Sequence, residues 1–138
     1  KNYGGNNILT SSEIKHIGIE SNNSNIKLFD RAKLWIGPKD SRTPLHKDAP
    51  KNLALQLYGD KTWRFFNSND NKYLCFKENN TNLEWSNYEL GDLSSCPSAK
   101  NATMFSIKMT PGDMLYLPKQ WAHDVKNNDN SVMINYWY

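Results

Sequence analysis

The chain has 138 residues, a length that suits a single domain (residues 1–138) with its own core and is short for two. Its 17 Lys and Arg and 14 Asp and Glu leave a net charge of +3, and the basic residues are scattered, which favours a solvated surface over an extended nucleic-acid face. No apolar run approaches the ~20 residues of a membrane span. No signal-peptide pattern follows Lys1, so we expect an intracellular protein, cytoplasmic or nuclear, and a fragment of a longer chain.

The first part of the chain, residues 1–33, is polar and poorly defined. Residues 14–19 form a short stretch with apolar side chains that fits either a strand or the end of a helix. Residues 26–29 and 34–37 predict short strands on either side of a turn.

The middle of the chain predicts a hairpin followed by a long polar insertion. Residues 52–58 and 61–66 flank Gly59-Asp60, a pattern typical of a β-hairpin. Residues 67–102 contain few strand signals beyond residues 73–76, and loops of this length are often functional or mobile. Further short strands are expected at residues 103–109, 114–117, 122–126 and 131–137. Many short strands without a helical period favour an antiparallel sandwich or small barrel, so the predicted fold class is mainly β.

The two cysteines, Cys75 and Cys96, fall in the least regular part of the chain. Without a secretion signal they are expected to be two reduced thiols, with a disulfide as the less favoured alternative. A zinc site is disfavoured because no histidine or third cysteine accompanies them at ligand spacing.

The segment of residues 43–48 places an imidazole and a carboxylate two residues apart in a setting that predicts a strand. Side chains alternate between the two faces of a strand, so His46 and Asp48 point the same way. His123 is the only later histidine, and it would complete the three-ligand face that non-haem Fe(II) oxygenases use. A His-x-Asp pattern alone is weak, because two polar residues on a partly exposed strand explain it equally well.

Six sequence elements in a fixed order strengthen the iron hypothesis. They are Leu34-Trp35-Ile36-Gly37-Pro38, Thr43-Pro44-Leu45-His46-x-Asp48, Asn52, Gly59-x-Lys61, Pro111-Gly112-Asp113 leading through Pro118 to Trp121-x-His123, and Asn135-x-Trp137. The run from Leu34 to Tyr138 resembles the JmjC domain of the cupin-type 2-oxoglutarate oxygenases. It is most similar to the small hydroxylase branch that includes the asparaginyl hydroxylase of hypoxia-inducible factor. The resemblance implies a double-stranded β-helix, a cupin or jelly-roll barrel, with the polar insertion between the two metal-ligand halves.

The resemblance also implies roles for individual residues. The iron ligands would be His46, Asp48 and His123, and the cosubstrate 2-oxoglutarate would place its distal carboxylate against Lys61 and Thr43. Asn52 and Asn135 match family positions near the cosubstrate and the metal. Without the motif, Lys61 would be taken as a surface lysine beside a turn. A structural hydrogen bond to the backbone is the alternative for Asn135.

Two departures from the family pattern concern the cosubstrate pocket. Ala54 stands where close relatives tend to have a bulkier residue, which implies a pocket that is roomier or is filled by a side chain from elsewhere. Many relatives also use a tyrosine well upstream of Thr43, which by spacing falls at or before the start of this sequence, and Tyr3 is a poor match.

The implied function is Fe(II)- and 2-oxoglutarate-dependent hydroxylation of a protein or peptide side chain. A histone lysine demethylase of the same superfamily is one alternative, although those enzymes usually carry glutamate where Asp48 stands. A non-catalytic cupin binding module is another. An RNA substrate stays possible, and the sequence does not indicate an oligomeric state.

Overall fold

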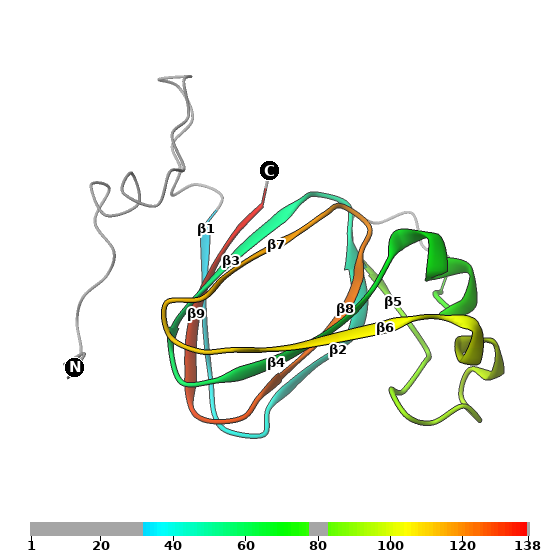
Figure 1. The fold of residues 1–138 in the computed structure, drawn as a ribbon, viewed down its shortest axis with the longest axis horizontal. Coiled ribbons are helices and arrows are strands. Elements are labelled where there is room, and N and C mark those ends of the chain that lie inside the picture. The colour runs from blue at the N-terminus through cyan, green and yellow to red at the C-terminus, as the bar shows by residue number, and fades with distance from the viewer. Residues whose placement is uncertain (1–31, 78–82, 138) are drawn as a thin grey trace, which may run out of the picture.

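The computed structural model describes residues 32–77 and 83–137, which fold into two antiparallel sheets that face each other (Figure 1). The four-stranded sheet has the order β1 (Ala32–Gly37), β9 (Ser131–Trp137), β3 (Asn52–Tyr58) and β7 (Met114–Leu117). The five-stranded sheet has the order β5 (Leu83–Trp85), β2 (Arg42–Asp48), β8 (Ala122–Asn127), β4 (Lys61–Phe66) and β6 (Met104–Met109). The prediction of a mainly β jelly-roll fold is confirmed. The strand predicted at residues 26–29 lies outside the described residues.

Successive strands alternate between the sheets, from β1 to β4 and again from β6 to β9. Each strand presents one face to the interior, because side chains alternate along it, and β3 buries Asn52, Ala54 and Gln56 while the residues between them are partly exposed. The interior holds an apolar core of side chains from both sheets. Its buried members are Ala54, Trp63, Met109, Leu117, Val125 and Met133.

The hairpin predicted for residues 52–66 is wrong, although both of its strands are present. β3 pairs with β7 and β9, whereas β4 pairs with β6 and β8. Gly59, at φ 64°, turns the chain from one sheet into the other, and a Cβ there would lie 1.9 Å from the carbonyl oxygen of Asn130. A glycine turn between two alternating strands has the same sequence pattern whether the strands pair or cross between sheets, which explains the error.

Residues 67–102 are not set apart from the barrel as the predicted insertion would be. They contain two 3-10 helices, η2 (Ser68–Tyr73) and η3 (Pro97–Asn101), and the strand β5 that extends the five-stranded sheet beside β2. The segment covers one end of the outer face of that sheet (Figure 1). A second apolar core lies beneath it, made of Leu45, Phe66, Leu74, Cys96, Ala99 and Ala122. The strand predicted at residues 73–76 is reduced to a single bridge between Phe76 and Ser86.

Cys75 and Cys96 form a disulfide, so the prediction of two reduced thiols is wrong. The fold brings their Cα atoms to 6.0 Å across 21 residues of sequence, within the range that a disulfide spans. The bond links the end of η2 to the start of η3 and adds a covalent tie to the second core. None of the helices in the described part of the chain has the length and apolar character needed to cross a membrane.

Candidate metal centre and adjoining pocket

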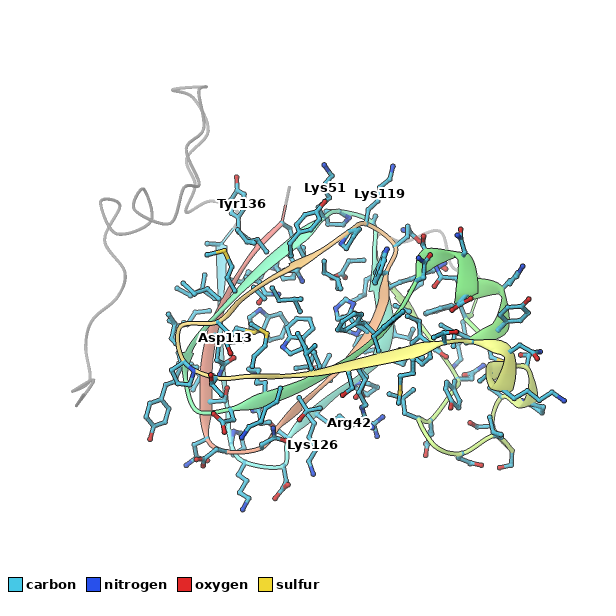
Figure 2. The ribbon with its side chains drawn as sticks, viewed as in Figure 1. Arg42, Lys51, Asp113, Lys119, Lys126 and Tyr136 are labelled. Carbon is cyan, nitrogen blue, oxygen red and sulfur yellow. A yellow bond between two sulfur atoms is a disulfide. The ribbon has the colours of Figure 1, made fainter. Side chains whose placement is uncertain are left out.

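His46, Asp48 and His123 meet inside the barrel. His46 and Asp48 lie on β2, and His123 lies on the neighbouring strand β8, directly opposite His46 in the antiparallel register. One potential ligand atom from each side chain lies within 4.8 Å of the other two. Asp124, the next residue along β8, points to the other face and is bound there by Arg42 and Arg64. Strand alternation therefore separates the candidate ligands from the charged outer face, where Arg42 and Lys126 point away from the barrel (Figure 2).

Both imidazoles are held by a carbonyl group two residues earlier in the chain. The Nδ1 atom of His46 lies 2.8 Å from the carbonyl oxygen of Pro44, and Nδ1 of His123 lies 3.0 Å from that of Trp121. A carbonyl oxygen only accepts hydrogen bonds, so a neutral imidazole in this arrangement carries its proton on Nδ1. The lone pair of each Nε2 atom is then available to a metal ion.

Burial favours the neutral state of His123 and of Asp48. It lowers the pKa of His123 to about 3, to which the neighbouring His46 contributes, while the hydrogen bond with the Trp121 carbonyl opposes the shift. Burial also raises the pKa of Asp48, although His46 and the hydrogen bond that Trp137 Nε1 donates over 3.2 Å act in the opposite direction. A divalent cation among these groups would supply the positive charge that stabilises the Asp48 carboxylate. The donor set therefore fits such an ion.

Two tryptophans fix the histidine rings. Trp63 stacks on His123 with ring centroids 5.5 Å apart and planes inclined by 20°, and Trp85 of β5 lies 4.9 Å from the ring of His46. Sequence reasoning missed both, because their place beside the histidines depends on which strands are neighbours. Trp35 and Trp137 line the pocket, and Trp121 packs against Phe65 and Phe105 beside the barrel core.

A pocket of about 360 Å³, part of it open to solvent, adjoins the three candidate ligands. All seven residues singled out from the sequence line it. The complete lining is Trp35, Thr43, His46, Asp48, Asn52, Lys61, Trp63, His123, Val125, Met133, Asn135 and Trp137. Ala54 is buried in the barrel core instead, so the expectation of a roomier pocket gains no support from its position.

Lys61 is a buried cation in the pocket wall, only 5% exposed. Its Nζ atom donates to Oδ1 of Asn127 over 2.7 Å, and no carboxylate of residues 32–77 or 83–137 lies within ion-pair distance of it. Burial lowers the pKa of Lys61. A buried ammonium without a countercharge is costly, so this position favours an anionic ligand.

Asn52 and Asn135 form a buried amide pair. Nδ2 of Asn135 donates to Oδ1 of Asn52 over 3.0 Å. The remaining amide atoms, Nδ2 of Asn52 and Oδ1 of Asn135, are buried without a hydrogen-bond partner within the described residues. Buried amides normally satisfy these atoms, so the pair offers one donor and one acceptor to a polar ligand.

Comparison with known proteins agrees with this architecture. Residues 9–138 match the family model described as a cupin-like domain, and the chain belongs to that family. Several of its relatives are named as JmjC domain-containing proteins, which confirms the resemblance to the JmjC domain. The chain is 33% identical to JmjC domain-containing protein C of Dictyostelium discoideum, in an alignment that covers 95% of this chain and 32% of the relative.

Two further relatives carry names that state an activity. The human bifunctional peptidase and (3S)-lysyl hydroxylase JMJD7 is 25% identical, over 81% of this chain and 42% of its own length. Lysine-specific demethylase 8 of Danio rerio is 29% identical, over 75% of this chain and 26% of its own length. The chain thus spans less than half the length of these relatives. It belongs to a family with both hydroxylases and demethylases among its members.

Proposed function

We propose that this chain acts as an Fe(II)- and 2-oxoglutarate-dependent oxygenase that hydroxylates a protein side chain. The observation that carries the proposal is the joint placement of the His46, Asp48 and His123 ligand atoms and the Lys61 ammonium in the wall of one pocket. A metal site alone would suit many cupins. A buried cation in the same pocket, with no carboxylate of the described residues paired with it, adds a place for a carboxylate.

In this proposal His46, Asp48 and His123 hold Fe(II) on one face, as in the two-histidine, one-carboxylate sites of non-haem oxygenases. Together with 2-oxoglutarate and O2, bound iron would supply the oxidising chemistry that places oxygen on an unactivated C–H bond. The chain's own contribution is to orient both imidazoles through the carbonyl groups of Pro44 and Trp121, so that Nε2 of each neutral ring is free to bind the metal. Trp63 and Trp85 hold the rings in place from either side.

Lys61 and Thr43 are assigned to the distal carboxylate of 2-oxoglutarate. The ammonium of Lys61 supplies a positive charge, and the hydroxyl of Thr43, also in the pocket wall, can donate a hydrogen bond. Asn52 and Asn135 offer their unpaired donor and acceptor to the polar groups of the bound ligands.

A protein or peptide substrate is supported by the names of the relatives, a lysyl hydroxylase and a lysine-specific demethylase. Asp48 in the second ligand position favours hydroxylation, because demethylases of this superfamily usually carry glutamate there. Histone demethylation is therefore the competing activity, and the two differ in the product that each releases.

The test uses the chain with Fe(II), 2-oxoglutarate and ascorbate in air. Succinate release that stops in His123→Ala supports an oxygenase. A screen of candidate peptides by mass spectrometry then separates the activities, since hydroxylation adds one oxygen atom and demethylation removes a methyl group. Tight 2-oxoglutarate binding with neither product nor succinate would contradict the proposal and favour a binding module.

A further inference from the structure

Asn127, the last residue of β8, forms hydrogen bonds to the turn between β1 and β2 through both its main chain and its side chain. Its main chain accepts a hydrogen bond from the Asp40 amide and donates one to the Ser41 carbonyl, both at 2.9 Å. Its side-chain Nδ2 donates to the Pro38 carbonyl over 3.1 Å and to Ser41 Oγ over 2.8 Å. The side chain is only 5% exposed, so the turn holds it in one orientation.

The orientation of the Asn127 amide follows from its partners. The Pro38 carbonyl can only accept, so the amide NH2 faces the turn and Oδ1 faces away from it. Oδ1 then accepts a hydrogen bond from the Lys61 Nζ atom, which lies 2.7 Å away. A protonated lysine has donors and no acceptor, so this is the direction that the pair must take. Gly37 makes the arrangement possible, because a Cβ there would lie 2.6 Å from Asn127 Nδ2.

A neutral partner has a specific consequence for Lys61. An amide oxygen fixes the direction of the ammonium without cancelling its charge, whereas a carboxylate in the same place would form an internal ion pair. The ammonium therefore remains able to attract an anion in the pocket. The turn, Asn127 and Lys61 form one hydrogen-bonded chain that ends at the pocket wall.

We propose that Asn127 is a positioning residue, which holds the Lys61 ammonium for the distal carboxylate of a keto-dicarboxylate cosubstrate. This inference rests on the proposed function and extends it to a residue outside the motif. Asn127 acts on the ligand only through Lys61. A substitution should therefore weaken binding of ligands that carry the distal carboxylate and spare those that lack it.

The test compares 2-oxoglutarate with 2-oxopentanoate, a keto acid of equal chain length that lacks the distal carboxylate. Calorimetry in the presence of Mn(II) gives both affinities. Asn127→Leu removes the acceptor, and Asn127→Asp keeps the shape but pairs internally with Lys61. Asn127→Leu should weaken 2-oxoglutarate binding about tenfold or more, the usual effect of losing a hydrogen bond to a charged group. Asn127→Asp should also weaken it, because the new carboxylate neutralises the Lys61 ammonium. Both variants should leave 2-oxopentanoate binding unchanged.

The matched control is Asn128→Leu, because Asn128 bonds Thr62 and does not touch Lys61. It should change neither affinity. In a Lys61→Met background, Asn127→Leu should add no further loss, since the two residues act as one unit. Thermal melts check that each variant is folded.

Parallel losses for the two keto acids, or additive losses in the double variant, would overturn the inference and leave Asn127 a structural residue. Unchanged 2-oxoglutarate affinity in both variants would overturn it as well. These outcomes differ from failure of the proposed function. In that case the unsubstituted chain would bind neither keto acid with Mn(II), or would bind 2-oxoglutarate and release no product or succinate.

Discussion

The two ends of the pocket are built in different ways. At the metal end the three candidate ligands come from two paired strands, and each imidazole is oriented by a carbonyl two residues away in the sequence. At the Lys61 end the cation comes from β4, its acceptor from β8 and the support of that acceptor from the β1–β2 turn. The metal end therefore depends on local geometry, and the Lys61 end depends on the packing of distant segments.

Burial has opposite consequences at the two ends. It lowers the pKa of His123 to about 3, which keeps the imidazole neutral and ready to bind a cation. It also lowers the pKa of Lys61, which weakens the charge that would attract a carboxylate. Burial thus leaves His123 ready to bind a metal ion, whereas the Asp48 carboxylate and the Lys61 ammonium are each stabilised only when an ion of opposite charge arrives.

The largest expected effect concerns the metal end. Anaerobic titration with Co(II) or Mn(II) should show one site that disappears in His46→Ala, Asp48→Ala and His123→Ala, because each variant removes one of three ligands. His16→Ala, which changes the remaining histidine of the chain, is the control and should retain the site. Unchanged stoichiometry in the three ligand variants would refute the assignment.

The second prediction separates the two ends. Lys61→Met should weaken 2-oxoglutarate binding by roughly 2–5 kcal/mol, the range for breaking a buried charge pair, and leave metal affinity nearly intact. Calorimetry with each ligand measures both effects. Lys108→Met is the matched control, because Lys108 is exposed on the neighbouring strand β6 and pairs with Asp60. If Lys61→Met weakened metal binding as much as 2-oxoglutarate binding, the two ends of the pocket would not act independently.

The third prediction asks whether residues 67–102 support the metal end. Reducing the Cys75–Cys96 disulfide should lower the free energy of unfolding by about 3 kcal/mol, because the bond restricts the unfolded chain by joining residues that are 21 positions apart. Urea denaturation with and without dithiothreitol measures it. The Cys75→Ala/Cys96→Ala variant should not respond to the reductant. β5 pairs with β2 and Trp85 contacts His46, so metal affinity should weaken more than binding of the distal carboxylate.

The smallest expected effect is a pH dependence confined to the Lys61 end. The protonated lysine binds the carboxylate, so affinity falls as pH rises through the lowered pKa of Lys61. The ratio of 2-oxoglutarate to 2-oxopentanoate affinity should drop between neutral pH and pH ~10, by at most about tenfold per pH unit. Lys61→Met should show a constant ratio over this range. A ratio independent of pH in the unsubstituted chain would show that Lys61 keeps its charge throughout.

The sequence determined the features that depend on residues close together in the chain. Strand periodicity of two puts His46 and Asp48 on one face wherever that strand lies, and the strands at residues 114–117 and 131–137 have the predicted bounds. The family pattern added Lys61, Thr43, Asn52 and Asn135, all of which line the pocket. Their roles as ligand contacts stay predictions.

The tertiary structure decided which strands are neighbours. A glycine turn after β3 predicts that the chain reverses direction. Whether β3 and β4 then pair with each other or join different sheets depends on which other strands bury them. Here β3 pairs with β9 and β4 pairs with β8, in different sheets. The disulfide and the contact of Trp85 with His46 likewise follow from the path of residues 67–102 over the second core. Asn127 carried no signal in the sequence, because its importance comes from two partners, Pro38 and Lys61, that lie 89 and 66 residues away and meet only in the folded barrel.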